Sequence, residues 1–222
     1  MTLDVSNMRF AYPGGDRGIH LAHLHVAEGK TLAVIGPSGC GKTTFLNLLS
    51  ALIRPDTGTI RIGATEVHAL SERQGQAYRA ESVGYIFQDF GLLDYLNARD
   101  NILHPFRIAR GRHISSAARD RVEALARDLG IADRLSHRPV QLSHGERQRV
   151  AICRAFVTEP SVLLADEPTG NLDPDTAKRI MDHLLESQRR LGATLVMVTH
   201  DHSLLDRFDH VLDFRDCWGP MQ

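Results

Sequence analysis

The sequence predicts an α/β domain built around a parallel β-sheet, with an N-terminal β subdomain and a helical insert. The strand-like segment TLAVIG (Thr31 to Gly36) runs through glycines into an apolar helix pattern over Thr43 to Ile53, which is typical of a βα unit. Three continuous apolar segments have no polar face and therefore predict buried parallel strands: Ser82 to Phe87, Val162 to Asp166 and Thr194 to Thr199.

The remaining segments complete this architecture. β-rich stretches lie at Leu3 to Tyr12 and Leu21 to Val26, and a short strand is expected at Val211 to Phe214. Between Gln88 and Pro160 the pattern is helical instead, over Ala98 to Ala109, Ser115 to Leu129 and Ser143 to Val157. We therefore expect one domain, in which residues 1–88 and 160–222 form the α/β core and residues 89–159 form a helical subdomain.

Composition excludes several classes of protein. The 222 residues include 26 Lys and Arg against 27 Asp and Glu, so no overall basic field points to nucleic acid, although Arg107 to Arg121 forms a local basic stretch. Three widely spaced cysteines without a CxxC pair argue against a disulfide framework or a zinc site and favour a reducing cytosol. Because no segment approaches the roughly 18 apolar residues of a membrane span, any role at a membrane is expected to need a partner.

The segment GPSGCGKTT matches the pattern GxxxxGK[ST] between a strand and a helix. In such a loop the backbone N–H groups surround phosphates, Lys42 reaches the β- and γ-phosphates, and Thr43 offers a hydroxyl to Mg²⁺. The thiol of Cys40, near Lys42 and a helix start, is expected to be either a reactive thiolate or a small packed group. The expected ATP-binding residues here are Gly36, Pro37, Ser38, Gly39, Cys40, Gly41, Lys42, Thr43 and Thr44.

Two adjacent carboxylates, Asp166 and Glu167, end the buried segment VLLADEP. Carboxylates at the carboxyl edge of an apolar strand are costly unless they meet a cation or a water molecule. We therefore expect Asp166 to bind Mg²⁺ and Glu167 to polarise the water that attacks the γ-phosphate. His200 ends the next apolar strand at the same edge, a position that favours a role in the site over a structural one.

Taken in order, GPSGCGKTT, Gln88 after a strand, LSHGERQ, LLADEPTGNLD and His200 resemble the motifs of the ATP-binding cassette (ABC) family over essentially the whole chain. The compact length, PTGNLD and FQDFGLLDYLNARDNI are most similar to cassettes of the LolD, MacB, FtsE and DevA type. The resemblance implies a P-loop NTPase core and an Mg²⁺-dependent ATPase that serves a transporter.

The resemblance also implies roles for individual residues. Tyr12 would stack on adenine, with simple packing as the alternative. Gln88 would sense both Mg²⁺ and the attacking water, so the expected metal residues are Thr43, Gln88 and Asp166, and His200 would contact the γ-phosphate. Two further motifs are implied: a signature formed by Ser143, His144, Gly145 and Glu146, and a D-loop formed by Asn171, Leu172 and Asp173.

The segment QLSHGERQ poses a separate question, because Ser143 and Glu146 have the spacing of a capping box at a helix start. A helix start is also an anion site, but one phosphate group needs one phosphate loop, so this second site has no role within its own subunit. In the head-to-tail dimer of the family, the signature of one subunit closes over the ATP of the other. His144 stands where glycine is usual and Glu146 where glutamine is common, so a requirement for positive φ at His144 would disturb the closed dimer.

The resemblance further implies a homodimer that powers a separately encoded integral membrane permease of the lipoprotein-release, macrolide-export or FtsX-like type, from the cytoplasmic face of the membrane. Two alternatives stay open: an FtsE-like ATPase that transports nothing, and a soluble cassette protein outside transport. Five apolar residues follow Gln88, of which about half are expected to serve the local core and the remainder to provide the groove for a helix of the permease: Phe90, Leu92, Leu93, Tyr95 and Leu96.

Overall fold

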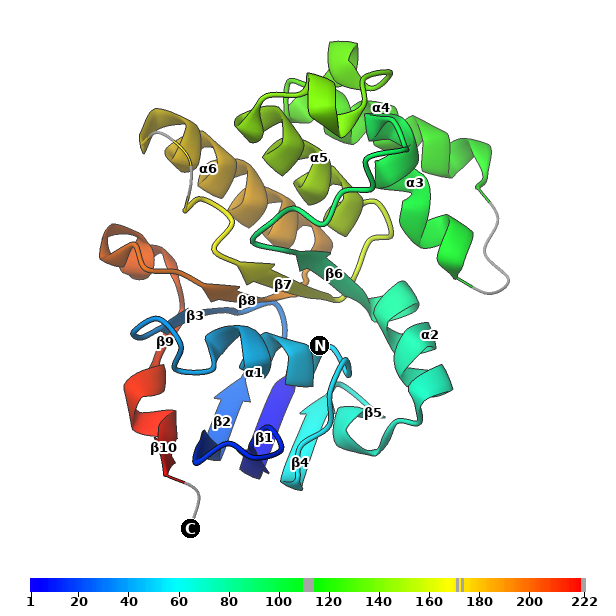
Figure 1. The fold of residues 1–222 in the computed structure, drawn as a ribbon. Helices are drawn as coiled ribbons and strands as arrows, with labels where there is room; N and C mark the ends of the chain where they lie inside the picture. The colour runs from blue at the N-terminus through cyan, green and yellow to red at the C-terminus, as the bar shows by residue number, and fades with distance from the viewer. Residues whose placement is uncertain (110–113, 171, 173, 221–222) are drawn as a thin grey trace.

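The computed structural model describes residues 1–109, 114–170, 172 and 174–220, and its elements surround two five-stranded sheets (Figure 1). The parallel sheet has the order β6-β7-β8-β3-β9, with strands Val83–Ile86, Val162–Asp166, Thr194–Val198, Thr31–Ile35 and His210–Asp213. The antiparallel sheet has the order β10-β2-β1-β4-β5, with strands Trp218–Pro220, Arg17–Val26, Leu3–Phe10, Thr57–Ile62 and Thr65–Glu66. The predicted parallel core, antiparallel β part and helical insert are all present.

The strands of the parallel sheet send alternate side chains into two apolar layers. Every residue of β3, β7 and β8 is buried. In β7, Leu163 and Ala165 belong to one hydrophobic cluster, whereas Val162 and Leu164 belong to the other. A sheet covered on both faces needs continuously apolar strands, which explains why these segments lack a polar face.

Helices cover both faces of this sheet (Figure 1). On one face, α1 (Lys42–Leu49) lies between the two sheets and buries Phe45, Leu46, Leu48 and Leu49. The other helices are α2 (Glu72–Ser82), α3 (Ala98–Ile108), α4 (Ser116–Asp128), α5 (His144–Phe156) and α6 (Pro174–Leu191), and α3 to α6 contribute to the cluster on the opposite face. Short 3₁₀ turns occupy Val67–Ala69, Ala132–Arg134, Pro139–Gln141, His202–Arg207 and Phe214–Cys217. Within the described ranges, none of the helices combines the length and the apolar character that crossing a membrane requires.

Most predicted segments agree with these elements to within a few residues. The helix predicted to reach Ile53 ends at Leu49, and the strand predicted to reach Tyr12 ends at Phe10. The sequence patterns did not predict α2, α6, β4 or β5. The buried residues of α6 recur at helical spacing, at Ile180, Met181, Leu184, Leu185 and Gln188, so this segment carries an amphipathic helix pattern that the predicted elements did not include.

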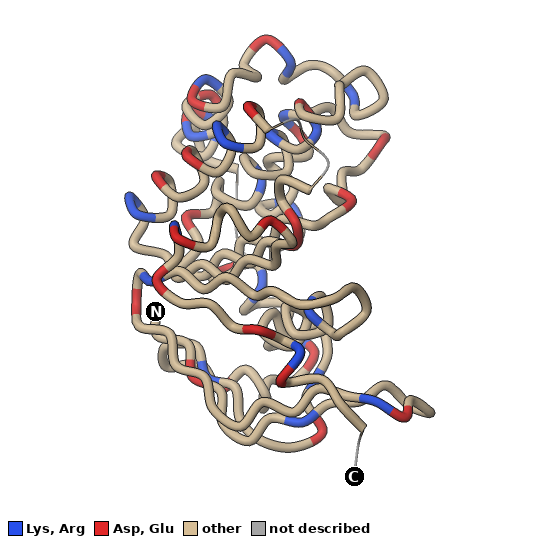
Figure 2. Tube along the Cα trace, turned by 90° about the vertical axis from the view of Figure 1, so that its left-hand side faces the viewer, with Lys and Arg blue, Asp and Glu red and all other residues tan. Residues whose placement is uncertain are grey.

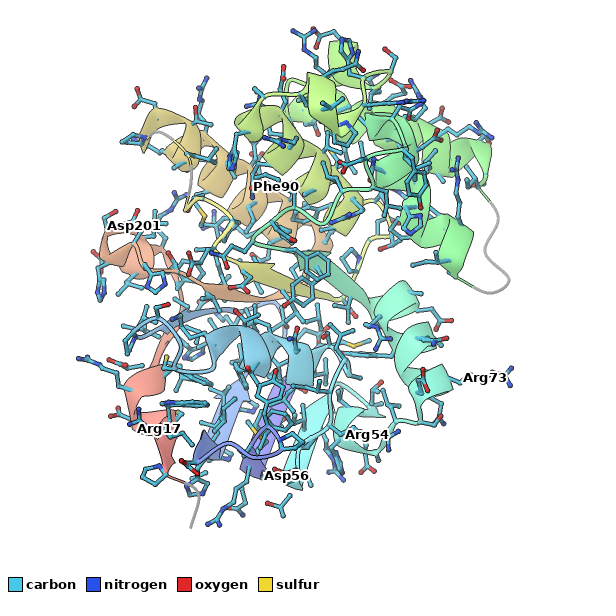
Figure 3. The ribbon with its side chains drawn as sticks, in the orientation of Figure 1. Arg17, Arg54, Asp56, Arg73, Phe90 and Asp201 are labelled. Atoms are coloured by element: carbon cyan, nitrogen blue, oxygen red, sulfur yellow. The ribbon has the colours of Figure 1, made fainter. Side chains whose placement is uncertain are left out.

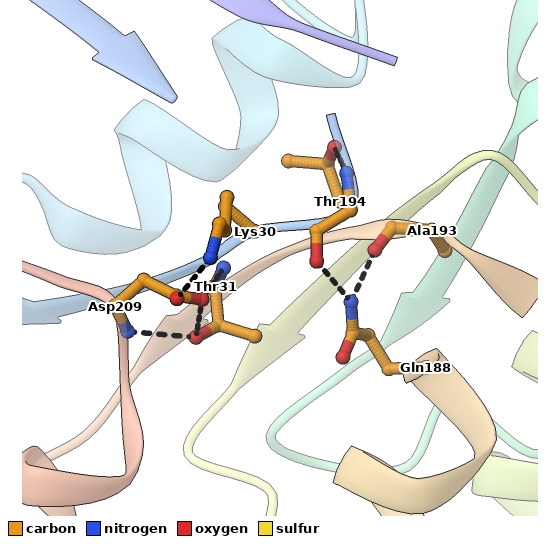
Figure 4. Close-up of polar contacts among 7 residues, drawn as sticks. Lys30, Thr31, Gln188, Ala193, Thr194 and Asp209 are labelled. Carbon is orange, nitrogen blue, oxygen red and sulfur yellow. Dashed lines mark hydrogen bonds and ion pairs between the residues drawn. The ribbon is translucent and has the colours of Figure 1, made fainter. Parts of the chain in front are cut away.

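Asp209 fastens β9 to the start of β3 at the amino edge of the parallel sheet (Figure 4). Its carboxylate accepts hydrogen bonds from Lys30 Nζ at 2.8 Å and from the N–H and hydroxyl of Thr31 at 2.9 Å each. The Lys30 bond and the Thr31 donors hold the pKa of Asp209 down at about 2. Beside this contact, the Gln188 amide of α6 donates to the Gly29 carbonyl at 2.9 Å, so α6 is tied to the same edge.

We expect Asp209→Asn to flatten the acid dependence of stability. Because the folded-state pKa of about 2 lies below the ordinary value of 3.8, the carboxylate stabilises the fold above about pH 4, and this contribution is lost as the pH falls from about 4 to about 2. Urea midpoints measured across that range should fall more steeply for the wild type than for Asp209→Asn. The exposed carboxylate Asp120 of α4 provides a control: Asp120→Asn should keep the wild-type slope, and equal slopes for all three proteins would contradict the assignment.

Candidate functional site

The loop from Gly36 to Thr44, called the phosphate loop below, connects β3 to α1 at the carboxyl edge of the parallel sheet. Gly36, Gly39 and Gly41 have φ angles of 142°, 78° and 89°, which residues with a Cβ rarely adopt. A Cβ on Gly36 would also lie 3.0 Å from the sulfur of Cys40. The loop conformation therefore requires these glycines.

The start of α1 is suited to an anion. Gly41 is its N-cap residue, and within the described part of the chain no side chain caps this helix and no acidic residue lies in its first turn. The starts of other helices are capped by side chains, namely those of Ser71, Asn97, Ser115 and Ser143. An uncapped start leaves backbone N–H groups for an outside acceptor, and the helix dipole adds partial positive charge. Phosphate oxygens fit both properties.

Lys42 and Cys40 lie at the same loop but differ in character. Lys42 is buried, and its Nζ donates to the carbonyls of Gly36 and Pro37 at 2.8 Å each, which keeps the cation at the loop. The Cys40 side chain is only 4% exposed and packs within the cluster around α1. Reactive thiolates need partial exposure, so the structure favours the packed thiol, and any contribution of Cys40 to an anion site comes from its backbone.

Thr43 and Asp166 meet although 123 residues separate them: the Thr43 hydroxyl donates to Asp166 Oδ2 at 2.7 Å. Burial raises the pKa of the Asp166 carboxyl, and the Thr43 hydrogen bond acts in the opposite direction. Gln88 lines the same hollow, together with Asn47 and His144. Hydroxyl, amide and carboxylate oxygens are ligands that Mg²⁺ accepts, so these residues fit the expected ion, whose charge would offset the burial of Asp166.

Glu167 follows Asp166 at the end of β7 and has a left-handed backbone, with a φ angle of 49°. Its N–H donates to the Val198 carbonyl at 3.0 Å, and its Oε1 lies 2.6 Å from Nε2 of His200, which follows β8. Such a backbone costs about 1–3 kcal/mol and persists only where the surrounding structure fixes it. The arrangement pairs a carboxylate with an imidazole that orients it, next to Asp166.

Tyr12 lies beside the end of the phosphate loop. Its ring is 51% exposed, packs edge to face on Phe10 with 5.0 Å between centroids, and places its hydroxyl 3.5 Å from Thr44 Oγ1. The contact with Phe10 leaves much of the ring open to solvent. Both packing and adenine stacking are therefore compatible with its position.

Ser143 and Glu146 form the predicted capping box at the start of α5. The Ser143 hydroxyl accepts the Glu146 N–H at 3.2 Å, and Glu146 Oε2 accepts the Ser143 N–H at 2.8 Å. Glu146 Oε1 also accepts a bond from Arg134 Nε at 2.8 Å. The pKa of Glu146 is lowered mainly by the hydrogen bond from the Ser143 backbone and next by the bond from Arg134, which keeps the capping carboxylate ionised.

His144 and Gly145 follow the cap inside the helix. His144 is the first residue of α5 and is not among the described non-glycine residues with positive φ, so its backbone in this structure does not need the conformation that favours glycine. Its ring packs edge to face on Phe90 at 4.6 Å between centroids. A Cβ added to Gly145 would find its nearest described neighbour, Leu172 Cδ2, at 3.8 Å. The subunit thus has room for a side chain at Gly145, and the glycine fits a close approach from outside.

The expected D-loop is placed only in part. Asn171 and Asp173 lie outside the described residues. Leu172 is half-buried against the helical cluster, close to Gly145. Of the three expected D-loop residues, only Leu172 therefore has a described position.

Phe90 and Arg154 anchor the loop after Gln88, a role that the sequence did not reveal. Phe90 is buried, has a φ angle of 66° and lies beside α5 (Figure 3). Arg154 Nη2 donates to the Phe90 carbonyl at 2.5 Å, and Arg154 Nη1 donates to the Gly91 carbonyl. Burial lowers the pKa of Arg154 to about 10. Arg154 is one of several arginines in α5, so only tertiary structure distinguishes it.

Acidic and basic residues are interspersed along the trace, without one charged face standing out in this view (Figure 2). In the arginine-rich stretch, Arg107 pairs with Asp100 at 2.6 Å and Arg121 pairs with Glu159 at 2.9 Å. Residues 110–113 of this stretch lie outside the described ranges. Of the three described arginines in this stretch, Arg107 and Arg121 are therefore ion-paired, whereas Arg119 is exposed.

The chain is similar to proteins of one family. Residues 19–170 match the ABC transporter family. The chain is 41% identical to the lipoprotein-releasing system ATP-binding protein LolD 1 of Rhodopirellula baltica, over 96% of this chain and 94% of that protein. It is 42% identical to the lipoprotein-releasing system ATP-binding protein LolD of Syntrophus aciditrophicus, over 87% of this chain and 86% of that protein.

Two solved structures share the fold. One is the dimeric post-hydrolysis state of an ATP-binding cassette bound to ADP and Pi, with a TM-score of 0.85 and 30% identity over 95% of this chain and 93% of that chain. The other is a dimeric bacterial ABC transporter cassette, with the same TM-score and identity over 99% of both chains. Together with the family match and the uncapped phosphate loop beside Asp166, they show that the chain belongs to the ABC transporter family, as an ATP-binding cassette ATPase.

Proposed function

We propose that the protein is the ATPase subunit of a lipoprotein-releasing type of ABC transporter, that it acts with Mg²⁺ as a head-to-tail homodimer, and that it powers a separately encoded membrane permease from the cytoplasmic face. The two relatives that are lipoprotein-releasing system ATP-binding proteins support the proposal. The observation that carries it is the grouping of Thr43, Asp166, Glu167 and His200 at one edge of the parallel sheet. Residues 1–88 and 160–222 would form the nucleotide-binding core, and residues 89–159 the helical subdomain.

The phosphates of ATP would bind to the N–H groups at the start of α1 and to Lys42. Thr43 and Asp166 would hold Mg²⁺, with Gln88 beside them, and the ion supplies charge that stabilises the transferring phosphoryl group. Within the described residues, no cluster of three or more His, Cys, Asp or Glu side chains could hold a metal. Mg²⁺ is commonly held by one or two carboxylates together with substrate phosphates and waters, so its binding here is expected to depend on ATP.

Glu167 would act as the base in this site. Oε1 is bonded to His200 Nε2, and the second oxygen, Oε2, for which the described part of the chain shows no hydrogen bond, would accept one from the attacking water. His200 would also hold the carboxylate in position and contact the γ-phosphate. The left-handed backbone of Glu167 is the strained feature that gives the carboxylate this direction.

We expect Glu167→Gln to bind ATP but to lose roughly 10²–10⁴-fold in turnover, because binding uses the phosphate loop and water activation uses the carboxylate. The measurements are steady-state phosphate release and calorimetric ATP affinity. Glu159→Gln is a matched control, since Glu159 also has positive φ but lies in an ion pair with Arg121. Phosphate release near the wild-type rate in Glu167→Gln would remove this residue from the role of base.

The start of α5 supports the dimer. Ser143 is exposed, and among the described residues none comes closer than 3.8 Å to a Cβ added at Gly145. Both features suit a second anion site that faces the nucleotide of a partner subunit. The two solved cassettes with the same fold are dimers, which also supports a dimer for this chain.

We expect ATP to dimerise Glu167→Gln, and the added substitution Ser143→Arg to block dimerisation while ATP still binds each monomer. Ser115→Arg is the matched control, because Ser115 caps α4 in the same way and both changes lose a cap worth about 1 kcal/mol. Size exclusion with light scattering, with ATP and Mg²⁺, measures the outcome. Equal dimerisation of the Ser143 and Ser115 variants would exclude α5 from the interface.

A groove of about 450 Å³ between α2, α3 and β6 is the proposed docking site for the permease. Its exposed apolar members are Leu52, Phe87 and Ile108. The wall also carries Arg79, His104 and Arg154. The pKa of His104 is lowered mainly by burial and further by the charges of Arg154 and Arg107. At neutral pH the permanent cations in the wall are therefore the arginines. An amphipathic helix with a carboxylate on its apolar side suits this lining.

Of the loop residues expected to dock the permease, only Leu93 lines this groove. Leu93 lines the groove, but Phe90 is buried, Leu92 packs on the helical cluster, and Tyr95 is 71% exposed outside the groove lining. Leu96 is half-buried. Besides Gly91 and Leu93 of this loop, the groove draws on α2 and β6 before it, on α3 directly after it and on the end of α5.

A pair of stacked rings connects the groove to the nucleotide site. Tyr85 and Phe87 stack with 4.1 Å between centroids and line both the groove and the hollow that contains Thr43, Gln88 and Asp166. The Tyr85 hydroxyl donates to Asn47 Oδ1 at 3.3 Å. Pressure from a docked helix on Phe87 would therefore reach the neighbourhood of the expected metal ligands by direct contact.

We expect Ile108→Glu to abolish binding to membranes that contain the permease while leaving the ATPase of the free protein within about twofold, because the new charge would be buried on docking. The assay adds purified protein to inside-out vesicles of the native cells after urea has removed peripheral proteins. Tyr95→Glu adds the same charge to an exposed aromatic outside the groove and should bind normally. If both variants bind, the interface lies elsewhere.

A further inference from the structure

The last described strand, β10, brings the only tryptophan of the chain to the nucleotide-binding side of the antiparallel sheet. β10 pairs with β2 through Trp218 and Ile19. The turn before it buries Phe214 and Cys217. Trp218 itself is half-buried.

The indole of Trp218 lies against the backbone of Gly41. A Cβ on Gly41 would stand 3.0 Å from Cε3 and Cζ3 of the indole and 3.1 Å from Cγ1 of Ile19. The same segment reaches the other end of the loop, because a Cβ on Gly36 would stand 3.3 Å from the Cβ of Phe214. Residues 214–218 therefore support both glycines that bound the phosphate loop.

Support at Gly41 matters because this residue is the uncapped N-cap of α1, with a φ angle of 89°. Glycine has the greatest backbone freedom of any residue, and it has no side chain of its own to fix its position. Donors that are already held in the bound arrangement bind more tightly than donors that must be ordered on binding. A rigid surface beneath Gly41 therefore favours phosphate binding.

We propose that Trp218 is a positioning residue for ATP: its indole braces Gly41 and so keeps the N–H groups of the phosphate loop in the arrangement that accepts phosphates. The inference rests on the proposed role of this loop in ATP binding. It assigns a function to a residue outside the motifs of the loop, on a strand of the other sheet. It also makes the indole a reporter of the loop, since the ring touches it.

The first test compares Trp218→Ala, Trp218→Phe and Cys217→Ala. Trp218→Ala should raise the Kd for ATP, and the KM, by roughly three- to tenfold, in line with the freedom of an unbraced glycine, with kcat at saturating ATP within about twofold. Trp218→Phe should restore most of the affinity because it keeps a flat ring. Cys217→Ala removes a buried thiol from the same turn and should leave the Kd unchanged. Wild-type Kd in Trp218→Ala, or equal losses in Trp218→Ala and Cys217→Ala, would overturn the proposal.

The second test uses the wild-type protein and does not depend on the folding of any Trp218 variant. Titration with ATP should change the emission or the acrylamide quenching of the single tryptophan, with the same midpoint as calorimetric binding. Lys42→Ala separates the two levels of the argument. If Lys42→Ala binds ATP as well as the wild type, the proposed site is wrong; if it loses binding while ATP leaves the wild-type indole spectrum and quenching unchanged, the role of Trp218 is wrong.

Discussion

The hydrogen bond from Thr43 to Asp166 joins the start of α1 to the end of β7, and the nucleotide site depends on this junction. It brings a hydroxyl from the phosphate loop to a carboxylate that burial makes harder to ionise. The bond can form because α1 is held between two sheets by its buried face. Glu167 is placed by following Asp166 in the chain, and Gln88 lines the same hollow as Asp166.

Several features of the site are unfavourable when considered alone. Asp166 is buried, Glu167 has a left-handed backbone, and α1 starts without a side-chain cap among the described residues. A natural protein keeps such departures from local preference mainly where function needs them. All three occur at one edge of one sheet, and a nucleotide with its cation would compensate each of them. The continuous apolar strands on either side supply the stability that this edge does not.

Sequence patterns predicted the parts of the molecule whose signals are local. The phosphate loop, the strand that carries Asp166 and the capping box of Ser143 are each encoded within a few residues. Helix α6 was not predicted although its buried residues recur at helical spacing. The proposed docking groove combines the loop after Gln88 with parts of α2, β6, α3 and α5, a combination that no single stretch of sequence shows. The burial of Cys40 depends on packing, which no local pattern records, whereas the helical backbone of His144 follows from its place directly after the cap residue Ser143.

The position of β3 has a consequence for synthesis of the chain. This strand carries the phosphate loop and is made early, yet its neighbours in the sheet are β8 and β9, and Thr31 finds Asp209 at a separation of 178 residues. A nascent chain must therefore carry an apolar strand without lateral partners until the ribosome has passed β8, a state in which chains are prone to aggregate. A truncated product could contain every residue of the phosphate loop and still lack the sheet that gives the loop its shape.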